Sequence, residues 1–181
     1  MTRLLSPADY ITTPWKSGRG TTTEVARDAG SGFEFGWRIS TAPVIEDGPF
    51  SAFAGITRSI AVIEGAGLQL SFADGRAHRL LPFAPFTFDG GKPPDARLID
   101  GPSRDFNVMV RRGEWRAELE VLRQADGQRL GPVTGGAALL HIVSGRWRAD
   151  SKLPPQHTLI FDAPQTLTGS GAALLVRILP A

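Results

Sequence analysis

Residues 34–41 read Glu-Phe-Gly-Trp-Arg-Ile-Ser-Thr, and large apolar side chains occupy alternate positions of this stretch. In an extended chain Phe35 and Trp37 share one face, whereas Arg38 and Ser40 share the other. The same period of two recurs later, at residues 68–72, 106–110 and 115–121. Because side chains alternate across a strand but not across a helix, this pattern predicts half-buried β-strands.

Turn residues separate these apolar runs. The 181-residue chain carries 21 glycines and 14 prolines, which is too many for a helical bundle. Asp-Gly pairs, which favour tight turns, stand at residues 47–48, 74–75, 89–90, 100–101 and 126–127. Ser6 and Pro7 provide a helical start and predict a single turn. Together these features predict an all-β fold.

The two halves of the chain resemble each other. The apolar runs 60–65 and 140–145 each end in glycine. Further on, a Leu-Pro pair leads to a Phe-Asp pair in each half, at residues 81–89 and 153–162. A duplicated unit of this size predicts two small β-barrels, residues 1–112 and 113–181, packed as one compact unit. Chance similarity between all-β segments is the alternative.

The net charge, the lack of cysteine and the hydropathy of the chain limit which partners, chemistry and compartment we expect. The chain has 20 Lys and Arg against 18 Asp and Glu, and the net charge of +2 gives no strong field for a polyanion. Cysteine is absent, which fits a reducing compartment and excludes thiolate chemistry. The first residues lack an apolar signal run, and no apolar stretch reaches the about 20 residues of a membrane span. We expect a cytoplasmic protein that contacts neither membrane nor nucleic acid.

A longer motif resembles a known family. Residues 14–25, Pro-Trp-Lys-Ser-Gly-Arg-Gly-Thr-Thr-Thr-Glu-Val, are similar to the opening signature of the HutD/Ves family, the histidine-utilisation protein D group. Further matching motifs follow in order, at residues 37–42, 47–53, 82–90 and 105–109, with Arg58 seven residues before Gly65. The resemblance covers residues 1–125 well and the C-terminal third poorly. The family loop reads Trp-Lys-Asn-Gly-Gly-Gly, whereas this chain has Ser17 and Arg19, and an arginine in place of glycine disfavours a positive φ.

The resemblance implies a bicupin, that is, two cupin barrels of the double-stranded β-helix, jelly-roll-like type in one chain. It also implies a role beside histidine degradation, as a sensor or governor that binds a small carboxylate such as N-formylglutamate or urocanate. The oligomeric state stays open, and a homodimer is compatible with this interpretation.

The sequence offers no metal site of the usual cupin type. Metal cupins use a His-x-His pair, a following Glu and a later His, because these groups must converge on one ion. His78, His141 and His157 are scattered along the chain and unpaired. We therefore expect no metal and no cofactor. His141 lies in an apolar strand pattern, where we expect a satisfied barrel residue.

A binding site for a small anion remains. Arg58 opens an otherwise apolar strand, and its guanidinium fork matches a carboxylate bidentately, so we expect it to clamp the ligand. An ordinary solvated arginine at a strand start is the alternative. The residues expected to assist it carry hydroxyl, amide, guanidinium or aromatic groups: Arg38, Ser40, Thr21, Thr22, Asn107, Trp15, Phe50 and Phe88. The aromatic side chains would wall the ligand cleft or simply fill the barrel core.

Catalysis is the main alternative function. A cofactor-free isomerase or hydrolase acting on a small organic acid or sugar would need a titratable pair, and metal-free sugar epimerases of the cupin class use His and Tyr. Tyr10 is the sole tyrosine and lies far in sequence from any histidine, although folding can reunite them. A nucleic-acid partner would need a continuous basic stripe, which the acidic neighbours of Arg111 and Arg112 argue against. We expect a binding protein without a reaction of its own.

Overall fold

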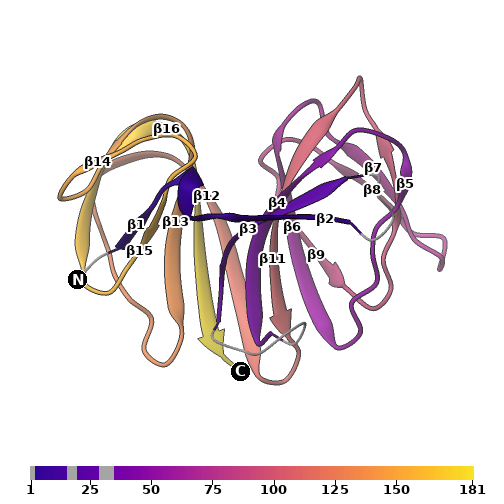
Figure 1. The fold of residues 1–181 in the computed structure, drawn as a ribbon, viewed down its shortest axis with the longest axis horizontal. Coiled ribbons are helices and arrows are strands. Elements are labelled where there is room, and N and C mark those ends of the chain that lie inside the picture. The colour runs from indigo at the N-terminus through magenta and orange to yellow at the C-terminus, as the bar shows by residue number, and fades with distance from the viewer. Residues whose placement is uncertain (1–2, 16–19, 29–34) are drawn as a thin grey trace. The chain divides into compact units, whose positions relative to one another are not determined.

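The computed structural model describes residues 3–15, 20–28 and 35–181 (Figure 1). Strands β1 to β16 carry the regular structure, and within those ranges the one helical element is the 3-10 turn η1, Pro7–Asp9. The predicted all-β fold and the predicted single turn after Ser6 are therefore confirmed. Over the same ranges, no helix is long and apolar enough to cross a membrane.

The chain divides into two compact units. The N-terminal unit contains Ile11–Trp115. The C-terminal unit contains Arg116–Ala181 together with the first ten residues, Met1–Tyr10. The sequence-based division at 112/113 falls in the turn between β11 (Ser103–Arg111) and β12 (Trp115–Leu130). Nothing in the hydrophobic pattern indicates that the first strand of the chain belongs with its last third.

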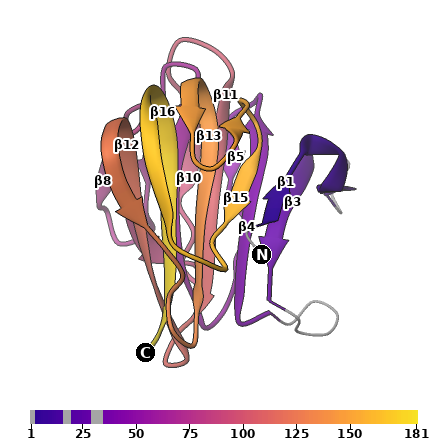
Figure 2. The ribbon, with the colours of Figure 1, turned by 90° about the vertical axis from the view of Figure 1, so that its left-hand side faces the viewer.

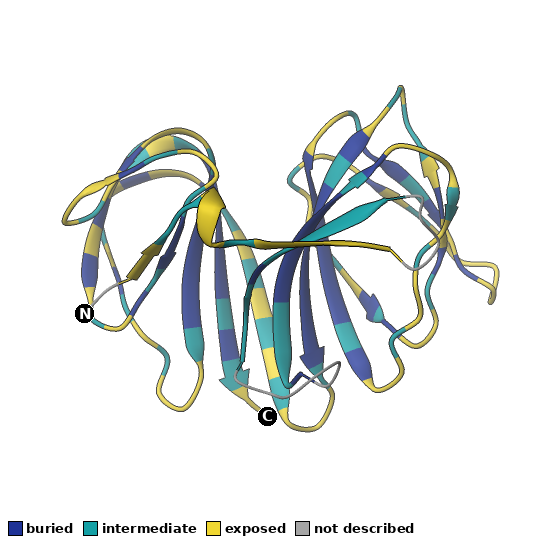
Figure 3. Ribbon diagram, viewed as in Figure 1, coloured by how far each residue is buried: buried dark blue, intermediate teal, exposed yellow. Residues whose placement is uncertain are grey.

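Two sheets form the N-terminal unit. The six-stranded sheet has the order β2-β3-β4-β11-β6-β9, and the four-stranded sheet has the order β5-β10-β7-β8. The larger sheet contains, besides β11, the strands β2 (Ile11–Pro14), β3 (Thr21–Arg27), β4 (Trp37–Val44), β6 (Ile56–Glu64) and β9 (Phe86–Asp89). The smaller sheet contains β5 (Gly48–Pro49), β7 (Leu68–Ser71), β8 (Ala77–Leu80) and β10 (Asp95–Leu98). The edge strand β2 is exposed along its length (Figure 3).

The apolar core of the N-terminal unit joins these two sheets. Ile60 and Val62 from β6 cluster with Leu68 and Leu70 from β7. Cross-strand partners share a face, so the residues of β4 and β11 in register with Ile60 and Val62 also point into the unit. Figure 3 shows β4, β6 and β11 buried along most of their length. The register of this sheet therefore decides which polar side chains are inside.

The C-terminal unit is built on a sheet with the order β1-β15-β13-β16-β12, and β14 pairs with β13. Its strands, besides β12, are β1 (Arg3–Leu5), β13 (Ala137–Arg148), β14 (Lys152–Leu153), β15 (Thr158–Ile160) and β16 (Gln165–Pro180). The first strand of the chain, β1, lies antiparallel to β15 (Figure 2). Leu140, Ile142 and Trp147 belong to its apolar core.

The two glycines of the internal repeat both adopt positive φ, 92° at Gly65 and 95° at Gly145. A Cβ at Gly65 would collide with the carbonyl oxygen of Pro102, and a Cβ at Gly145 with that of Ser170. Because only glycine tolerates both the dihedral angle and the close approach, backbone geometry explains why the residue recurs.

Candidate functional site

Three neighbouring strands of the six-stranded sheet bring Arg38, Met109 and Arg58 side by side, and we call these three residues the arginine row. Met109 on β11 is in register with Arg38 on β4 and with Arg58 on β6. Phe88 on β9 is in register with Arg58 on the far side. Cross-strand partners point to the same face, so both guanidinium groups lie on the face that carries Ile60 and the core. The order β4-β11-β6-β9 thus gathers residues that are far apart in sequence.

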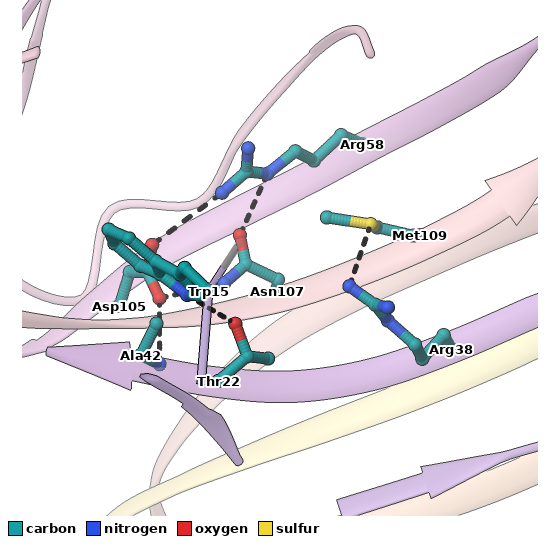
Figure 4. Close-up of polar contacts among 8 residues, drawn as sticks. All are labelled: Trp15, Thr22, Arg38, Ala42, Arg58, Asp105, Asn107 and Met109. Atoms are coloured by element: carbon teal, nitrogen blue, oxygen red, sulfur yellow. Dashed lines mark hydrogen bonds and ion pairs between the residues drawn. The ribbon is translucent and has the colours of Figure 1, made fainter. Parts of the chain in front are cut away.

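Arg58 is held by polar partners from β11 (Figure 4). Its side chain is buried, with 6% of the residue exposed. Nε of Arg58 donates to Oδ1 of Asn107 at 2.8 Å, and Nη2 lies 3.6 Å from Oδ2 of Asp105. Oδ1 of Asp105 accepts the backbone N–H of Ala42 at 3.0 Å and Nδ2 of Asn107 at 2.7 Å. The guanidinium therefore belongs to a buried network and is not a solvated group at a strand start.

Aromatic rings flank the Arg58 guanidinium. Its Cζ lies 4.5 Å from the centroid of the Phe50 ring and 5.6 Å from that of Phe88. At these distances the negative ring faces attract the cation. The structure thus brings Phe50, Phe88 and Asn107, three of the predicted site residues, to Arg58.

Burial has the largest effect on the pKa values of Arg58 and Asp105. It lowers the pKa of Arg58 to about 10, an effect that Asp105 opposes and the nearby charge of Arg38 reinforces. Burial likewise raises the pKa of Asp105, against the influence of Arg58 and of the hydrogen bonds from Asn107 and Ala42. At neutral pH Arg58 remains a cation, because its pKa still lies well above 7.

Arg38 has a different environment from Arg58. Its Nη2 donates to the thioether Sδ of Met109 at 3.8 Å, and the thioether is a weak acceptor. Its buried Nε has no hydrogen-bond partner among the described residues. The rings of Phe35 and Phe53 lie 5.1 and 5.5 Å from its Cζ. Burial lowers the pKa of Arg38, while the charge of Glu24 acts in the opposite direction.

Ser40 lies on the same interior face. It is in register with Asn107 on one side and with Glu24 of β3 on the other. Its side chain is buried. Arg38 and Ser40, which alternate with Trp37 and Ile39 in the sequence, thus both point toward the core of the N-terminal unit.

The threonines and Trp15 occupy the β2–β3 hairpin. Pro14 is in register with Thr21, and Nε1 of Trp15 donates to the Thr22 hydroxyl at 2.8 Å (Figure 4). The backbone N–H of Trp15 also donates to the carbonyl of Gly20 at 2.8 Å. These bonds hold the two ends of the Gly-rich loop. Ser17 and Arg19, the departures from the family loop, lie outside the described residues.

The histidines do not fit a metal centre. Within the described ranges, no three His, Asp or Glu side chains are grouped to hold an ion. The ring of His78 stacks on Phe86 with centroids 3.8 Å apart, and Nδ1 of His157 lies 3.0 Å from the carbonyl oxygen of Pro155. Nδ1 of His141 lies 2.8 Å from the hydroxyl of Thr158. Each ring thus has a protein contact of its own, and we derive no metal chemistry from them.

Folding does reunite Tyr10 with His141. The Tyr10 hydroxyl donates to the carbonyl of Gln156 at 2.7 Å and lies 2.8 Å from the hydroxyl of Thr158. The same Thr158 hydroxyl contacts His141, so a hydrogen-bonded chain joins the two titratable groups within the C-terminal unit. Sequence spacing alone gives no sign of this arrangement, because β1 and β15 come from opposite ends of the chain.

A shallow concavity of about 370 Å³ opens in the C-terminal unit. Its lining includes Leu4, Leu159, Asp150 and Gln165. Because a carboxylate lines it and a guanidinium does not, it suits a carboxylate ligand less than the arginine row does.

The predicted site residues do not include three groups that lie around the arginines. Asp105 is the carboxylate of Arg58, and Phe35 and Phe53 enclose Arg38. Period-two alternation places Asp105, Asn107 and Met109 on one face, which was a usable signal. It could not show which strand lies opposite them, because that depends on sheet order.

Sequence comparisons point to one family. The HutD family profile matches residues 7–176. An uncharacterised 21.2 kDa protein from the hutC 3′ region of Pseudomonas putida is 44% identical over 120 residues, which cover 65% of this chain and 63% of that protein. Protein Ves of Citrobacter koseri is 33% identical over 143 residues, which cover 77% of this chain and 71% of that protein. The chain therefore spans less than two thirds of the length of the Pseudomonas putida relative.

Solved structures agree with the sequence matches. HutD from Pseudomonas fluorescens SBW25 superposes with a TM-score of 0.86 at 33% identity over 100% of both chains. Bacterial pirin YhhW from Escherichia coli and an oxalate decarboxylase from Bacillus subtilis superpose with TM-scores of 0.70 and 0.63. They are 10% and 8% identical, cover 99% and 98% of this chain, and account for 99% and 78% of their own lengths. These two cupins support the fold alone, and they confirm the predicted bicupin architecture. With its profile, its relatives and its fold in agreement, the chain belongs to the HutD family.

Proposed function

We propose that the N-terminal unit binds a small organic carboxylate through the arginine row. The observation that carries this proposal is a charge imbalance inside the unit. Arg38 and Arg58 share one interior face, and among the described residues Asp105 is the one carboxylate within 4 Å of either guanidinium. Arg58 is buried and Arg38 partly buried, and cations withdrawn from water are costly unless they are paired, so an organic anion bound here would complete the pairing.

The walls of the site support the same ligand class. Phe50 and Phe88 lie beside Arg58, and Phe35 and Phe53 lie beside Arg38. Apolar walls exclude water and so strengthen the attraction between a guanidinium and a carboxylate. Ser40 and Asn107 add a hydroxyl and an amide on the same face.

Membership of the HutD family supports a role in histidine utilisation. We propose that the chain acts there as a metabolite sensor or governor, with N-formylglutamate or urocanate as the candidate ligands. The absence of cysteine fits such a role in the cytoplasm.

Calorimetric titration tests the proposal directly. We expect heat of binding with N-formylglutamate or urocanate, and a loss of about 2–5 kcal/mol in binding free energy for Arg58→Ala, which leaves the buried charge of Asp105 unpaired. Arg104→Gln is the matched control, because Arg104 lies on β11, pairs with Glu64 at the surface and should leave binding unchanged. Absence of heat with both acids would reject carboxylate binding.

A cofactor-free enzyme is the second candidate function. The chain that joins Tyr10 to His141 through Thr158 favours it, since such a pair can move a proton. We place it second because the Tyr10 hydroxyl already donates to the carbonyl of Gln156. Turnover of a small acid that is lost in His141→Gln would favour catalysis over binding alone.

A further inference from the structure

We propose that Arg38, and not Arg58, holds the acid group of the ligand, while Arg58 is a positioning residue that neutralises Asp105. This inference rests on the proposed carboxylate binding and assigns the roles within that site. It reverses the order suggested by the sequence, in which Arg58 is the clamp and Arg38 an assistant.

The guanidinium of Arg58 already has protein partners for its Nε and Nη2 donors and for its charge. Asn107 accepts the Nε hydrogen, Asp105 faces Nη2, and the ring of Phe50 lies against Cζ. Asp105 is itself fixed, because its Oδ1 accepts hydrogen bonds from Ala42 and Asn107. A ligand carboxylate at Arg58 would have to share the cation with a buried carboxylate 3.6 Å away, and like charges at such a distance repel.

The contacts of Arg38 leave its donors available. Among the residues described, its guanidinium makes one hydrogen bond, to the weak acceptor Sδ of Met109, and its Nε makes none. No carboxylate in that part of the chain lies within 4 Å of it, although Glu24 is close enough to affect its pKa. A guanidinium has five N–H donors in one plane, which match the two oxygens of a carboxylate. Among the described residues, Arg38 is therefore the cation of this pair that lacks an oxygen acceptor.

The local charge sum defines the ligand class. Arg58 and Asp105 cancel each other, and the two other charges that affect the pKa of Arg38, those of Glu24 and Arg27, are opposite in sign, so one net positive charge remains. The rings of Phe35 and Phe53 lie against that guanidinium, so a ligand must approach its N–H edge. The row therefore takes one carboxylate group, and any second acid group of the ligand must lie beyond it.

Four variants, titrated with N-formylglutamate and urocanate, test these roles. For Arg38→Met we expect binding to weaken at least about 30-fold, the loss typical of a desolvated charge-assisted contact. Arg58→Met should also weaken binding, because Asp105 then repels the ligand. Adding Asp105→Asn to Arg58→Met should restore binding to within about threefold of wild type, since the two charges are removed together. Asp105→Asn alone should tighten binding by leaving Arg58 uncompensated.

Thermal unfolding of each variant separates binding from folding. Arg38→Met should unfold no earlier than wild type, because an apolar side chain suits the surroundings of Phe35, Phe53 and Met109. Wild-type affinity in Arg38→Met, or a double variant that binds as poorly as Arg58→Met, would overturn the assignment. If the wild-type protein binds neither acid, the proposed function fails first, and the two failures are thereby distinguished.

Discussion

At the residue scale, His141 shows how burial can dominate the pKa of one side chain. It is 5% exposed, and burial lowers its pKa to about 4, with a smaller contribution from the charge of His157. In the unfolded chain its pKa is about 6.5. Between these two values the unfolded state binds a proton that the folded state does not bind, so stability decreases as the pH falls through this window.

The free energy of unfolding should therefore fall by up to about 3 kcal/mol between pH 7 and pH 4 through His141 alone. Urea unfolding at both pH values measures this, and His141→Gln should remove most of the difference. His157→Gln is the control and should preserve most of the difference, because the charge of His157 contributes less than burial to the lowered pKa of His141. An unchanged pH dependence in His141→Gln would mean that other groups cause it.

At the same scale, the sequence shows which residues share a face but not which residues they meet. Alternation places Arg38 with Ser40, and Asp105 with Asn107, as the register confirms. The ion pair between Arg58 and Asp105 depends on β6 lying beside β11, a contact between strands far apart in sequence. Residue spacing does not indicate which strands are neighbours in a sheet. The pairing of charges around Arg58 and Arg38 could therefore not be predicted.

At the scale of elements, the turn after β6 depends on one glycine. Gly65 has a φ of 92°, and a Cβ there would collide with the carbonyl of Pro102 and approach Ser103. Gly75 has a similar φ of 85° but open space around it. Both glycines thus have a positive φ, but a Cβ would collide with the backbone at Gly65 and not at Gly75.

Alanine substitutions at these glycines should separate strain from collision. We expect Gly75→Ala to lower the free energy of unfolding by about 1–2 kcal/mol, the cost of a positive φ in a residue with a Cβ. Gly65→Ala should cost about 3 kcal/mol or more, because backbone must also move. Chemical denaturation of both variants gives the comparison, and equal losses would show that the collision relaxes freely.

At the scale of the whole molecule, the chain begins and ends in the same compact unit. Strand β1 pairs with β15, and Tyr10 anchors to Gln156 and Thr158, whereas residues 11–115 form the other unit. Alternation and the internal repeat predicted two barrels. The pairing of the first strand with β15, in the unit formed by the last third of the chain, could not be predicted. A three-residue strand is too short to show a hydrophobic alternation.

Removal of residues 1–10 should therefore destabilise β13 and β15, although these strands lie far from residues 1–10 in the sequence. We expect faster amide hydrogen exchange in β15 and β13, since β15 loses its edge partner, and unchanged exchange in β6 and β11. Mass spectrometry of exchanged peptides measures this. Faster exchange in β6 and β11 instead would show that the first ten residues support the N-terminal unit.

The pairing of β1 with β15 also sets an order of events during synthesis. Residues 11–115 can complete their own sheets while the ribosome is still translating the rest. Strand β1, although it precedes that unit in the chain, has no partner until Thr158–Ile160 leaves the exit tunnel. A strand translated before the N-terminal unit is thus paired only after that unit can be complete.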